Sequence, residues 1–296
     1  MPAEVMIAQV RRFNRTVTQR VGALSDRYLA RDRSLGASRV LWEIGTEGCE
    51  VRTLRSRLAL DSGQLSRVLR LLEADGLVEV SPSSVDGRIR VARLTQAGTA
   101  ERALLDKRSD ELALSILAPL DESQRRELVT AMRTVERSIT TSLVDIRVVD
   151  PAGPDARRCL RAYFAELDRR SDSGFDPAKG TPAEPHELRA PAGAFLVAYL
   201  REEPIGCGAI KHHPNAASEI KRMWVAESAR GLGLGRRLLD ELEALAHERR
   251  APATRLDTNK TLIEAIAMYR SAGYREIRAF NDDPFAHHWF EKILQR

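Results

Sequence analysis

The sequence predicts two domains, a mainly α-helical domain over residues 1–145 followed by an α/β domain with a mixed sheet over residues 146–296. Three observations lead to this fold class. The chain has 296 residues, more than a single hydrophobic core usually serves. Apolar residues recur three and four apart in the first half, as they do along a helix that faces a core. From residue 146 onward, strand patterns alternate with helix patterns, which is typical of an α/β domain.

The overall composition is that of an ordinary globular protein, with 43% hydrophobic and 30% charged residues. No apolar run approaches the ~18 residues of a membrane span, and the N-terminus lacks the basic and then apolar layout of a signal peptide. The three cysteines, Cys49, Cys159 and Cys207, are far apart in the sequence. We therefore expect a cytoplasmic protein without a membrane span, a disulfide framework or a bound metal.

Two long apolar stripes at helical spacing frame the first half of the chain. The first stripe comprises Val10, Phe13, Val17, Val21, Leu24 and Tyr28. The second stripe comprises Leu128, Met132, Val135, Ile139 and Leu143. Stripes of this length suit packing between two chains, so we expect a homodimer. Shorter helices are predicted between them, at Ser38–Gly45, Arg52–Leu58 and Ser62–Ala74.

The stretch LDSGQLSRVLRLLEADGL has the pattern of a capped helix with one apolar face. Asp61 and Gln64 have the spacing of a capping box at its start. The apolar face consists of Leu65, Val68, Leu69 and Leu72. A very short connection separates this helix from the preceding one, which is the spacing of a helix-turn-helix. Polar side chains near the start of the second helix can then reach the major groove of DNA.

A predicted β-hairpin follows, with alternating apolar residues on both strands and a turn at Asp86-Gly87. Arg88 and Arg90 share one face of its second strand, where they could enter a minor groove. Between residues 52 and 93 the chain carries eight arginines against five acidic residues. This basic surplus is consistent with contact to phosphates, and a solvated surface is the alternative.

The segments SRVLWEIG, LDSGQLSRVLRLLEADGLVEV and DGRIRVARLTQAG resemble a MarR-type winged helix-turn-helix regulator, over roughly residues 5–145. The resemblance implies a homodimer on a pseudo-palindromic operator of double-stranded DNA, and an acid, Asp86, that orients Arg88. The recognition helix and the hairpin together give these candidate DNA contacts: Ser62, Gln64, Ser66, Arg67, Arg70, Arg88 and Arg90.

The second half begins with a predicted strand at Ile146–Val149 and a helix at Asp155–Arg169. Residues 170–192 are rich in Ser, Gly and Pro and are expected to form a loop or a weak helix. AFLVAYL and PIGCGAIK follow as two strands, and Glu219–Val225 is a third. Regular alternation along the third strand would place these residues on one face: Glu219, Lys221, Met223 and Val225.

The run ARGLGLG, between this strand and an amphipathic helix, has three possible interpretations. A Walker A loop requires Gly-Lys-Ser/Thr, whereas this chain has Gly235-Arg236-Arg237. A Rossmann fingerprint requires G-x-G-x-x-G, and the register here is different. The pattern Arg/Gln-x-x-Gly-x-Gly is met by Arg230, Gly233 and Gly235. Successive backbone N–H groups at a helix N-terminus can then converge on an anion such as a pyrophosphate.

RMWVAESARGLGLGRRLL and the later AIAMYRSAGY closely resemble two motifs of the GNAT acetyltransferases, over about residues 146–296. The resemblance implies acetyl-CoA as the acetyl donor. Loop amides with flanking arginines would hold the pyrophosphate, and amides of the preceding strand would pair with the pantetheine. The implied cofactor contacts are Met223, Val225, Arg230, Gly231, Leu232, Gly233, Leu234, Gly235, Arg236 and Asn259.

The same resemblance implies catalytic residues. Tyr269 falls on the family tyrosine that protonates the leaving sulfur, and a core tyrosine on an amphipathic helix is the alternative. Glu219 matches the base position of some members, acting directly or through water, and an exposed acid at a strand end is its alternative. His212 and His213 are other candidate bases. No spacing of His, Cys and acidic residues indicates a metal site.

The sequence therefore predicts a bifunctional protein, a DNA-binding regulator that also transfers an acetyl group to an amine of a small molecule or a protein. Two alternatives remain. The C-terminal domain could bind acetyl-CoA only as a sensor for the regulator, or the N-terminal domain could serve dimerisation without DNA binding. The presence of Tyr269 and Glu219 argues against the first alternative, and the arginines of the recognition helix and hairpin argue against the second.

Overall fold

The computed structural model describes residues 2–24, 28–171, 174–177, 179–180 and 183–294. The chain folds into two compact units, Met1–Thr130 and Ala131–Arg296. This division falls inside one long helix, ahead of the predicted boundary near Asp145. Each unit has its own buried apolar core, as separate domains require. Within the described ranges, no helix is both long enough and apolar enough to cross a membrane.

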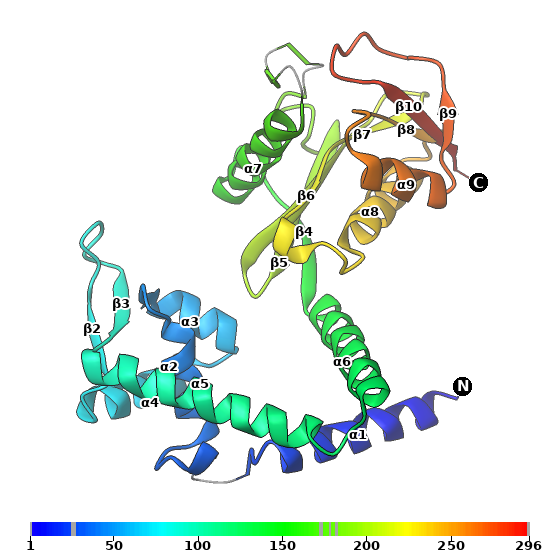
Figure 1. Ribbon diagram of the computed structural model, residues 1–296. Coiled ribbons are helices and arrows are strands. Elements are labelled where there is room, and N and C mark those ends of the chain that lie inside the picture. Colours follow the sequence, from blue (N-terminus) through cyan, green and yellow to red (C-terminus); the bar gives the residue numbers. More distant parts are fainter. Residues whose placement is uncertain (1, 25–27, 172–173, 178, 181–182, 295–296) are drawn as a thin grey trace. The chain divides into compact units, whose positions relative to one another are not determined.

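The N-terminal unit is mainly α-helical, with a small sheet (Figure 1). Its helices are α1 (Ala3–Arg20), α2 (Leu35–Ile44), α3 (Val51–Leu58), α4 (Ser62–Ala74), α5 (Gln96–Leu117) and the first part of α6 (Glu122–Ser142). Its strands are β1 (Cys49–Glu50), β2 (Val78–Pro82) and β3 (Arg90–Leu94). They form an antiparallel sheet in the order β1-β3-β2, in which β2 and β3 are the predicted hairpin. The predicted helix-turn-helix with a β wing is confirmed.

Helix α4 begins where the sequence predicts because its N-terminus is capped. The Asp61 carboxylate accepts a hydrogen bond from the Gln64 backbone N–H at 2.8 Å, and Gln64 Oε1 accepts one from the Asp61 N–H at 3.3 Å. This confirms the predicted capping box. Leu65, Leu69 and Leu72 are buried on the other side of the helix, in the core of this unit. The cap and the buried face together leave the polar side chains of α4 in solvent.

Two helices of this unit differ from the expectation. The first apolar stripe does not continue to Tyr28 as a helix, because α1 ends at Arg20 and a turn follows in which Gly22 has a φ of +67°. Leu24 is 90% exposed there, and residues 25–27 lie outside the described part of the chain. The long helix α5 has no apolar stripe that would predict it, and Leu105 is its one buried large apolar side chain among the described residues.

The C-terminal unit is a mixed sheet with helices on both faces (Figure 1). Its helices are the end of α6, α7 (Pro154–Arg170), α8 (Leu234–Glu248) and α9 (Ile263–Ser271). Its strands are β4 (Val144–Val148), β5 (Gly193–Leu200), β6 (Glu203–Lys211), β7 (Ser218–Val225), β8 (Ala253–Thr258), β9 (Arg275–Ile277) and β10 (His288–Ile293). Their order is β4-β5-β6-β7-β8-β10-β9, and β7 and β8 are a parallel pair among antiparallel neighbours. The predicted α/β fold with a mixed sheet is confirmed.

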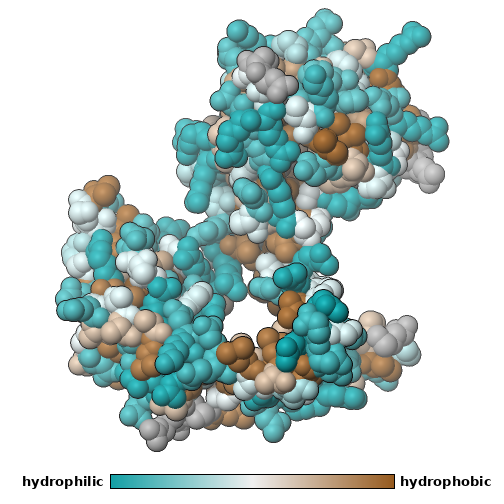
Figure 2. Space-filling model, in the orientation of Figure 1, coloured by the Kyte–Doolittle hydropathy of each residue, from teal (hydrophilic) through white to brown (hydrophobic). Residues whose placement is uncertain are grey.

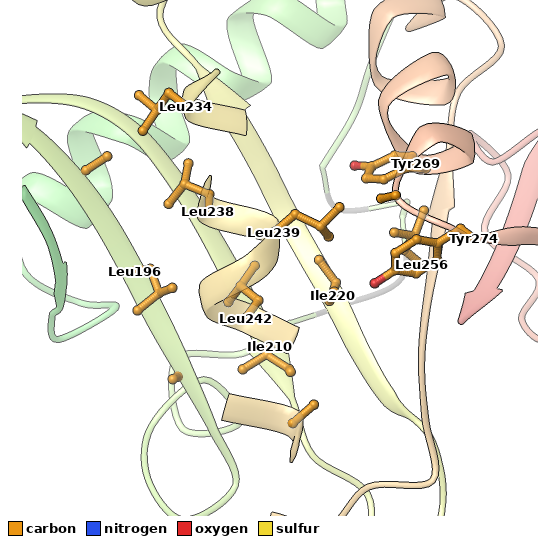
Figure 3. Close-up of a cluster of buried hydrophobic side chains, with 14 of the residues drawn as sticks. Leu196, Ile210, Ile220, Leu234, Leu238, Leu239, Leu242, Leu256, Tyr269 and Tyr274 are labelled. Atoms are coloured by element: carbon orange, nitrogen blue, oxygen red, sulfur yellow. The ribbon is translucent and has the colours of Figure 1, made fainter. Parts of the chain in front are cut away.

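Helix α8 supplies much of the core of this unit (Figure 3). Four of its five leucines lie on one face and are at most 2% exposed: Leu234, Leu238, Leu239 and Leu242. They pack over the sheet against Ile210 and Ile220, and burial of each leucine stabilises the fold by roughly 1.5–3 kcal/mol. Because α8 follows the glycine run directly, this packing also fixes the position of the run.

Strand β7 carries a bulge beside the glycine run. Its register with β6 shifts between Cys207 and Ala209, and Arg222 has a φ of +58°, in the left-handed region. An extra residue in one strand reverses the alternation of side chains beyond it. Lys221 pairs with Ala209, whose side chain packs toward α7, whereas Met223 packs in the core beneath α8.

The bulge overturns one expectation about this strand. Regular alternation would place Glu219, Lys221, Met223 and Val225 on one face, but the first two lie on the opposite face from the last two. The bulged strand β7 itself carries no glycine or proline that would have marked the bulge, although Gly208 lies opposite it on β6.

Strands β7 and β8 pair over a short distance and then separate. Their register comprises Ser218 opposite Thr254 and Glu219 opposite Arg255. The later residues of β7, from the bulge to Val225, therefore have backbone N–H and C=O groups that do not pair with β8. The opening between the two strands is where the candidate site lies.

Candidate functional site

A cavity of about 530 Å³ lies in the C-terminal unit at this opening. Its walls come from α7, the end of β7, the glycine run, the start of α8 and helix α9. Predicted site residues that line it are Met223, Val225, Arg230, Gly231, Gly233, Leu234, Gly235, Arg236 and Tyr269. The structure thus brings together residues that are up to 46 positions apart in the sequence, from Met223 to Tyr269.

Two glycines of the run have left-handed backbone conformations, with φ of +79° at Gly231 and +71° at Gly233. A Cβ atom built on either would meet nothing within 4 Å, so bare backbone faces open space in the cavity. Gly233 is the N-cap of α8, where backbone N–H groups have no partner within the helix. Such a loop at a helix N-terminus suits an anion. The residues present therefore fit a bound pyrophosphate.

The two arginines that flank the run are already paired with carboxylates. Arg230 donates a hydrogen bond to Glu166 at 2.5 Å, and Arg236 donates one to Asp240 at 2.8 Å. Glu166 also accepts a hydrogen bond from the Trp224 indole at 3.0 Å. Glu166 lines the cavity from α7 and was not singled out in the sequence, where it is one of several acids on an amphipathic helix.

Leu232 belongs to the run but lines neither this cavity nor the smaller one beside it. Its carbonyl accepts a hydrogen bond from Thr141 Oγ1 at 3.0 Å. Arg237, in the first turn of α8, donates to the carbonyls of Thr141 at 2.8 Å and Val144 at 3.1 Å. The glycine run is therefore tied on its outer side to the last turn of α6. No local pattern indicates this contact, because the partners are 91 to 96 positions apart.

Tyr269 and Tyr163 are two phenols that line the cavity. Burial raises the pKa of Tyr269, and it raises the pKa of Tyr163 to about 12. Both phenols are therefore protonated at neutral pH. Among the described residues, neither hydroxyl has a hydrogen-bond partner, although Tyr269 is only 4% exposed. A hydroxyl that lines a cavity and has no protein partner is free to bond a ligand. Tyr163 is a second cavity residue that the sequence did not single out.

A second cavity of about 90 Å³ adjoins the first. The residues common to both linings are Tyr163, Leu167, Met223, Leu262, Ala265 and Tyr269. Asn259 lies here rather than in the first cavity. Its Oδ1 accepts from the Thr261 backbone N–H at 2.9 Å, and its Nδ2 donates to the Phe285 carbonyl at 2.9 Å. In this structure Asn259 holds two loops together.

Glu219 lies outside the linings of both cavities. Its carboxylate accepts a hydrogen bond from Arg255 at 2.6 Å, and it lies 3.6 Å from Lys221 Nζ and 3.2 Å from His213 Nε2. Burial alone would raise the pKa of Glu219, but Arg255 and Lys221 outweigh it and lower the pKa below its usual value. The role of Glu219 as a base stays a prediction. In this structure its carboxylate neutralises the charges of Arg255 and Lys221.

The histidines that were candidate bases also lie outside both linings. His212 Nδ1 is 3.0 Å from Ser218 Oγ, and burial lowers the pKa of its ring. Over the part of the chain that the structure describes, no three His, Cys, Asp or Glu side chains gather as metal ligands.

The predicted DNA-contact residues lie on one helix and one hairpin of the N-terminal unit, and all are exposed: Ser62, Gln64, Ser66, Arg67, Arg70, Arg88 and Arg90. No described carboxylate forms an ion pair with any of the four arginines, whereas Arg31 and Arg33 in the same unit are both paired with Glu101. Exposed guanidinium groups without an ion-pair partner suit a polyanion.

Three of these residues have local partners that bear on the prediction. Arg70 Nε donates a hydrogen bond to the Ser66 carbonyl at 3.2 Å, which leaves its terminal nitrogens for an outside partner. Gln64 uses its Oε1 in the capping box, which leaves its Nε2 for an outside partner. Asp86 Oδ1 accepts from the backbone N–H of Arg88 at 3.0 Å and forms no bond with the Arg88 side chain. The resemblance implies that Asp86 orients the Arg88 guanidinium. In this structure Asp86 instead stabilises the turn through the Arg88 backbone.

Comparison with known proteins bears on both units. The family model described as the acetyltransferase (GNAT) family matches residues 161–274, and the model described as the MarR family matches residues 32–89. The IAA acetyltransferase of Azospirillum brasilense is 34% identical over 112 residues, which are 38% of this chain and 73% of that protein.

Two solved structures are also similar to this chain. A GNAT-family acetyltransferase of Staphylococcus aureus is 18% identical with a TM-score of 0.44, and the match covers 51% of this chain and 100% of that one. A GNAT-family acetyltransferase of Elizabethkingia anophelis with acetyl-CoA bound is 17% identical with a TM-score of 0.37, covering 51% of this chain and 99% of that one.

Proposed function

The chain belongs to the GNAT acetyltransferase family and carries a MarR-family domain in its N-terminal half, and on this premise we propose that it is both a DNA-binding regulator and an acetyl-CoA-dependent N-acetyltransferase. The acceptor is an amine of a small molecule or a protein. One observation carries the enzymatic part: the glycine run, the N-terminus of α8 and the free hydroxyl of Tyr269 open onto the same cavity.

Several parts of the chain would hold acetyl-CoA. The backbone from Gly231 to Gly235 and the N-terminus of α8 would bind the pyrophosphate, with Arg230 and Arg236 beside it. The backbone of Met223 and Val225, where β8 has moved away, would pair with the pantetheine as an added strand does. Acetyl-CoA, when bound, supplies an acetyl group activated as a thioester.

Transfer of the acetyl group forms a C–N bond and breaks the C–S bond of the thioester. The amine gives up a proton, and the departing sulfur takes one. Tyr269 is protonated at neutral pH, is buried and has no described hydrogen-bond partner, so it is the group that we expect to supply the proton to sulfur. We keep Glu219, acting directly or through water, as the proposed acceptor of the amine proton. Its lowered pKa makes it a weak base.

The regulatory part of the proposal is supported by the N-terminal unit. Its exposed and unpaired arginines lie on the recognition helix α4 and on the wing, as contact with a DNA duplex requires. Helix α1 has no buried residue, and its apolar side chains form exposed surface in Figure 2. The exposed set is Val5, Met6, Ile7, Val10, Phe13 and Val17. An uncovered stripe of this kind favours a homodimer, which suits a pseudo-palindromic operator.

The experiment that tests the enzymatic part is an acceptor screen with the full-length chain. Acetyl-CoA is mixed with small-molecule amines and with lysine-containing peptides, and release of free thiol is followed by a chromogenic disulfide. We expect one class of amine to raise thiol release above the rate of hydrolysis. Binding of acetyl-CoA by calorimetry without amine-dependent release would contradict catalysis and favour the alternative function.

That alternative, in which the C-terminal domain senses acetyl-CoA for the regulator, is favoured by one contact. The glycine run is bonded through Leu232 and Arg237 to the last turn of α6, and α6 begins in the N-terminal unit. A ligand that orders the run would therefore act on one end of a helix shared by both units. Its effect on DNA affinity can be no larger than its differential affinity for the two states of that helix. Sensing and catalysis are compatible, and both enter the predictions below.

A further inference from the structure

We propose that the acceptor is an amine that carries a carboxylate, and that Arg222 binds this carboxylate in the second cavity. The inference depends on the proposed acetyl transfer and names the substrate class of that same site. In the reaction the amine loses a proton and gains the acetyl group, CoA leaves as the thiol, and the carboxylate is unchanged. Arg222 is a binding residue for this group.

The first argument is position. Arg222 lines the second cavity, which adjoins the cofactor cavity at Tyr163 and Tyr269. A molecule in the second cavity therefore has its near end where an acetyl group would be delivered, and its far end beside the guanidinium. The shared lining residues therefore let one acceptor molecule contact both the cofactor cavity and Arg222.

The second argument is charge. Among the residues that the structure describes, four charged ones line the second cavity: Lys221, Arg222, Asp257 and Asp283. Lys221 donates to Asp257 at 2.9 Å, and Asp257 also accepts from Asn281 Nδ2 at 2.8 Å. Asp283 accepts from the Phe285 backbone N–H at 2.9 Å and has a further partner. Arg222, by contrast, has no ion pair or side-chain hydrogen bond with any described residue. Arg222 is therefore the charged side chain of this lining whose charge has no polar partner among the described residues.

The third argument is orientation. The Arg222 guanidinium lies 5.0 Å from the ring centroid of Phe164, which holds it through a cation–π contact while its donors stay available. Its backbone has a φ of +58° at the bulge, a conformation that costs an arginine free energy and that glycine or asparagine adopts more readily. A strained residue that is held in place and left unpaired is a candidate for ligand binding. The planar guanidinium can bind a carboxylate through two parallel hydrogen bonds.

The wall next to this arginine is aromatic. The Phe164 and Phe175 rings are stacked with centroids 5.8 Å apart, and Phe175 and Phe285 follow at 4.7 Å. Phe175 and Phe285 line the second cavity. An acceptor with an apolar group beside its carboxylate, as in an amino acid with an apolar side chain, would use both features. A polyamine would place cationic groups against an unpaired cation, and a peptide lysine would bring no carboxylate of its own.

The test compares kcat/KM for matched pairs of amines that differ at one group. Apolar amino acids are each compared with their own carboxamides, at saturating acetyl-CoA, with thiol release as the signal. We expect the wild-type chain to prefer the carboxylate by about 10- to 150-fold, the range of one hydrogen bond between charged groups. Arg222→Gln should remove most of this preference, and Arg222→Lys should keep part of it.

The matched control is Arg161→Met, since Arg161 is an exposed arginine of the adjacent helix α7 that lines neither cavity. This variant should keep the wild-type preference. Thiol release with carboxamides at or above the rate with amino acids would overturn the inference and leave the proposed acetyl transfer standing. A preference that survives in Arg222→Gln would move the carboxylate site elsewhere. Absence of release with every amine would contradict the proposed function, and the inference with it.

Discussion

The glycine run offers a substitution whose effect can be worked out from the structure. Gly233 has a φ of +71°, and a Cβ atom added there meets no protein atom within 4 Å. Gly233→Ala therefore fits the fold, at a cost of about 1–2 kcal/mol for an L-residue in the left-handed region. Its methyl group, however, lies in the cavity at the N-terminus of α8, where the pyrophosphate is expected.

We expect the methyl group to disrupt at least one charge-assisted hydrogen bond from the backbone to the pyrophosphate. The loss is about 1.5–3 kcal/mol, or roughly 10- to 150-fold in acetyl-CoA affinity. Calorimetry measures the affinity, and thermal unfolding checks the fold. The matched control is Gly273→Ala, which introduces the same methyl at a φ of +90° outside both cavities and should leave affinity unchanged. Equal affinities of wild type and a folded Gly233→Ala protein would refute the assignment of the run.

Three further predictions concern charge and coupling. In Glu219→Gln, the melting temperature at pH 7 should fall, because the folded-state pKa of Glu219 is lowered from its usual value by Arg255 and Lys221. The difference from wild type should vanish as pH drops through that lowered pKa. An unchanged pH profile of turnover would move the base role to another group. Arg67→Ala should lower operator affinity and relax sequence preference by ~1–3 kcal/mol, whereas Arg88→Ala should weaken binding to all DNA and reduce the salt dependence. In mobility-shift titrations, equal losses on operator and random DNA for Arg67→Ala would make it a phosphate contact. If acetyl-CoA changes operator affinity, the change should be about 5- to 150-fold, as in other coupled systems. Arg237→Met should make this change smaller. An equal change in wild type and variant would show that the contact between Arg237 and α6 does not couple the two sites.

The sequence predicted the elements whose signals are local. The start of α4 was predicted because a capping box involves residues three positions apart, and its buried face because apolar residues repeat every turn. The glycine run was located for the same reason, since its function depends on consecutive backbone groups. Both sites were therefore visible as short patterns.

Other features depend on contacts that no local pattern records. Helix α5 has no apolar stripe, so periodicity could not reveal it. The bulge at Arg222 arises from the register between β6 and β7. It places Glu219 and Met223 on opposite faces of the sheet, whereas regular alternation predicts the same face. Tyr163 and Glu166 reach the cavity because α7 packs over the sheet, which is a tertiary event. The same holds for the bonds between the glycine run and α6.

The measurement that tests the central claim most directly is turnover of the Tyr269→Phe protein. The substitution removes one hydroxyl from a buried side chain and leaves the ring that packs near Tyr274 and Phe290. With an amine acceptor and saturating acetyl-CoA, we predict that thiol release falls by roughly 10²- to 10⁴-fold while acetyl-CoA affinity stays nearly unchanged, since the proton is needed in the transition state. Turnover at the wild-type rate would contradict the account, because some other group would then protonate the sulfur.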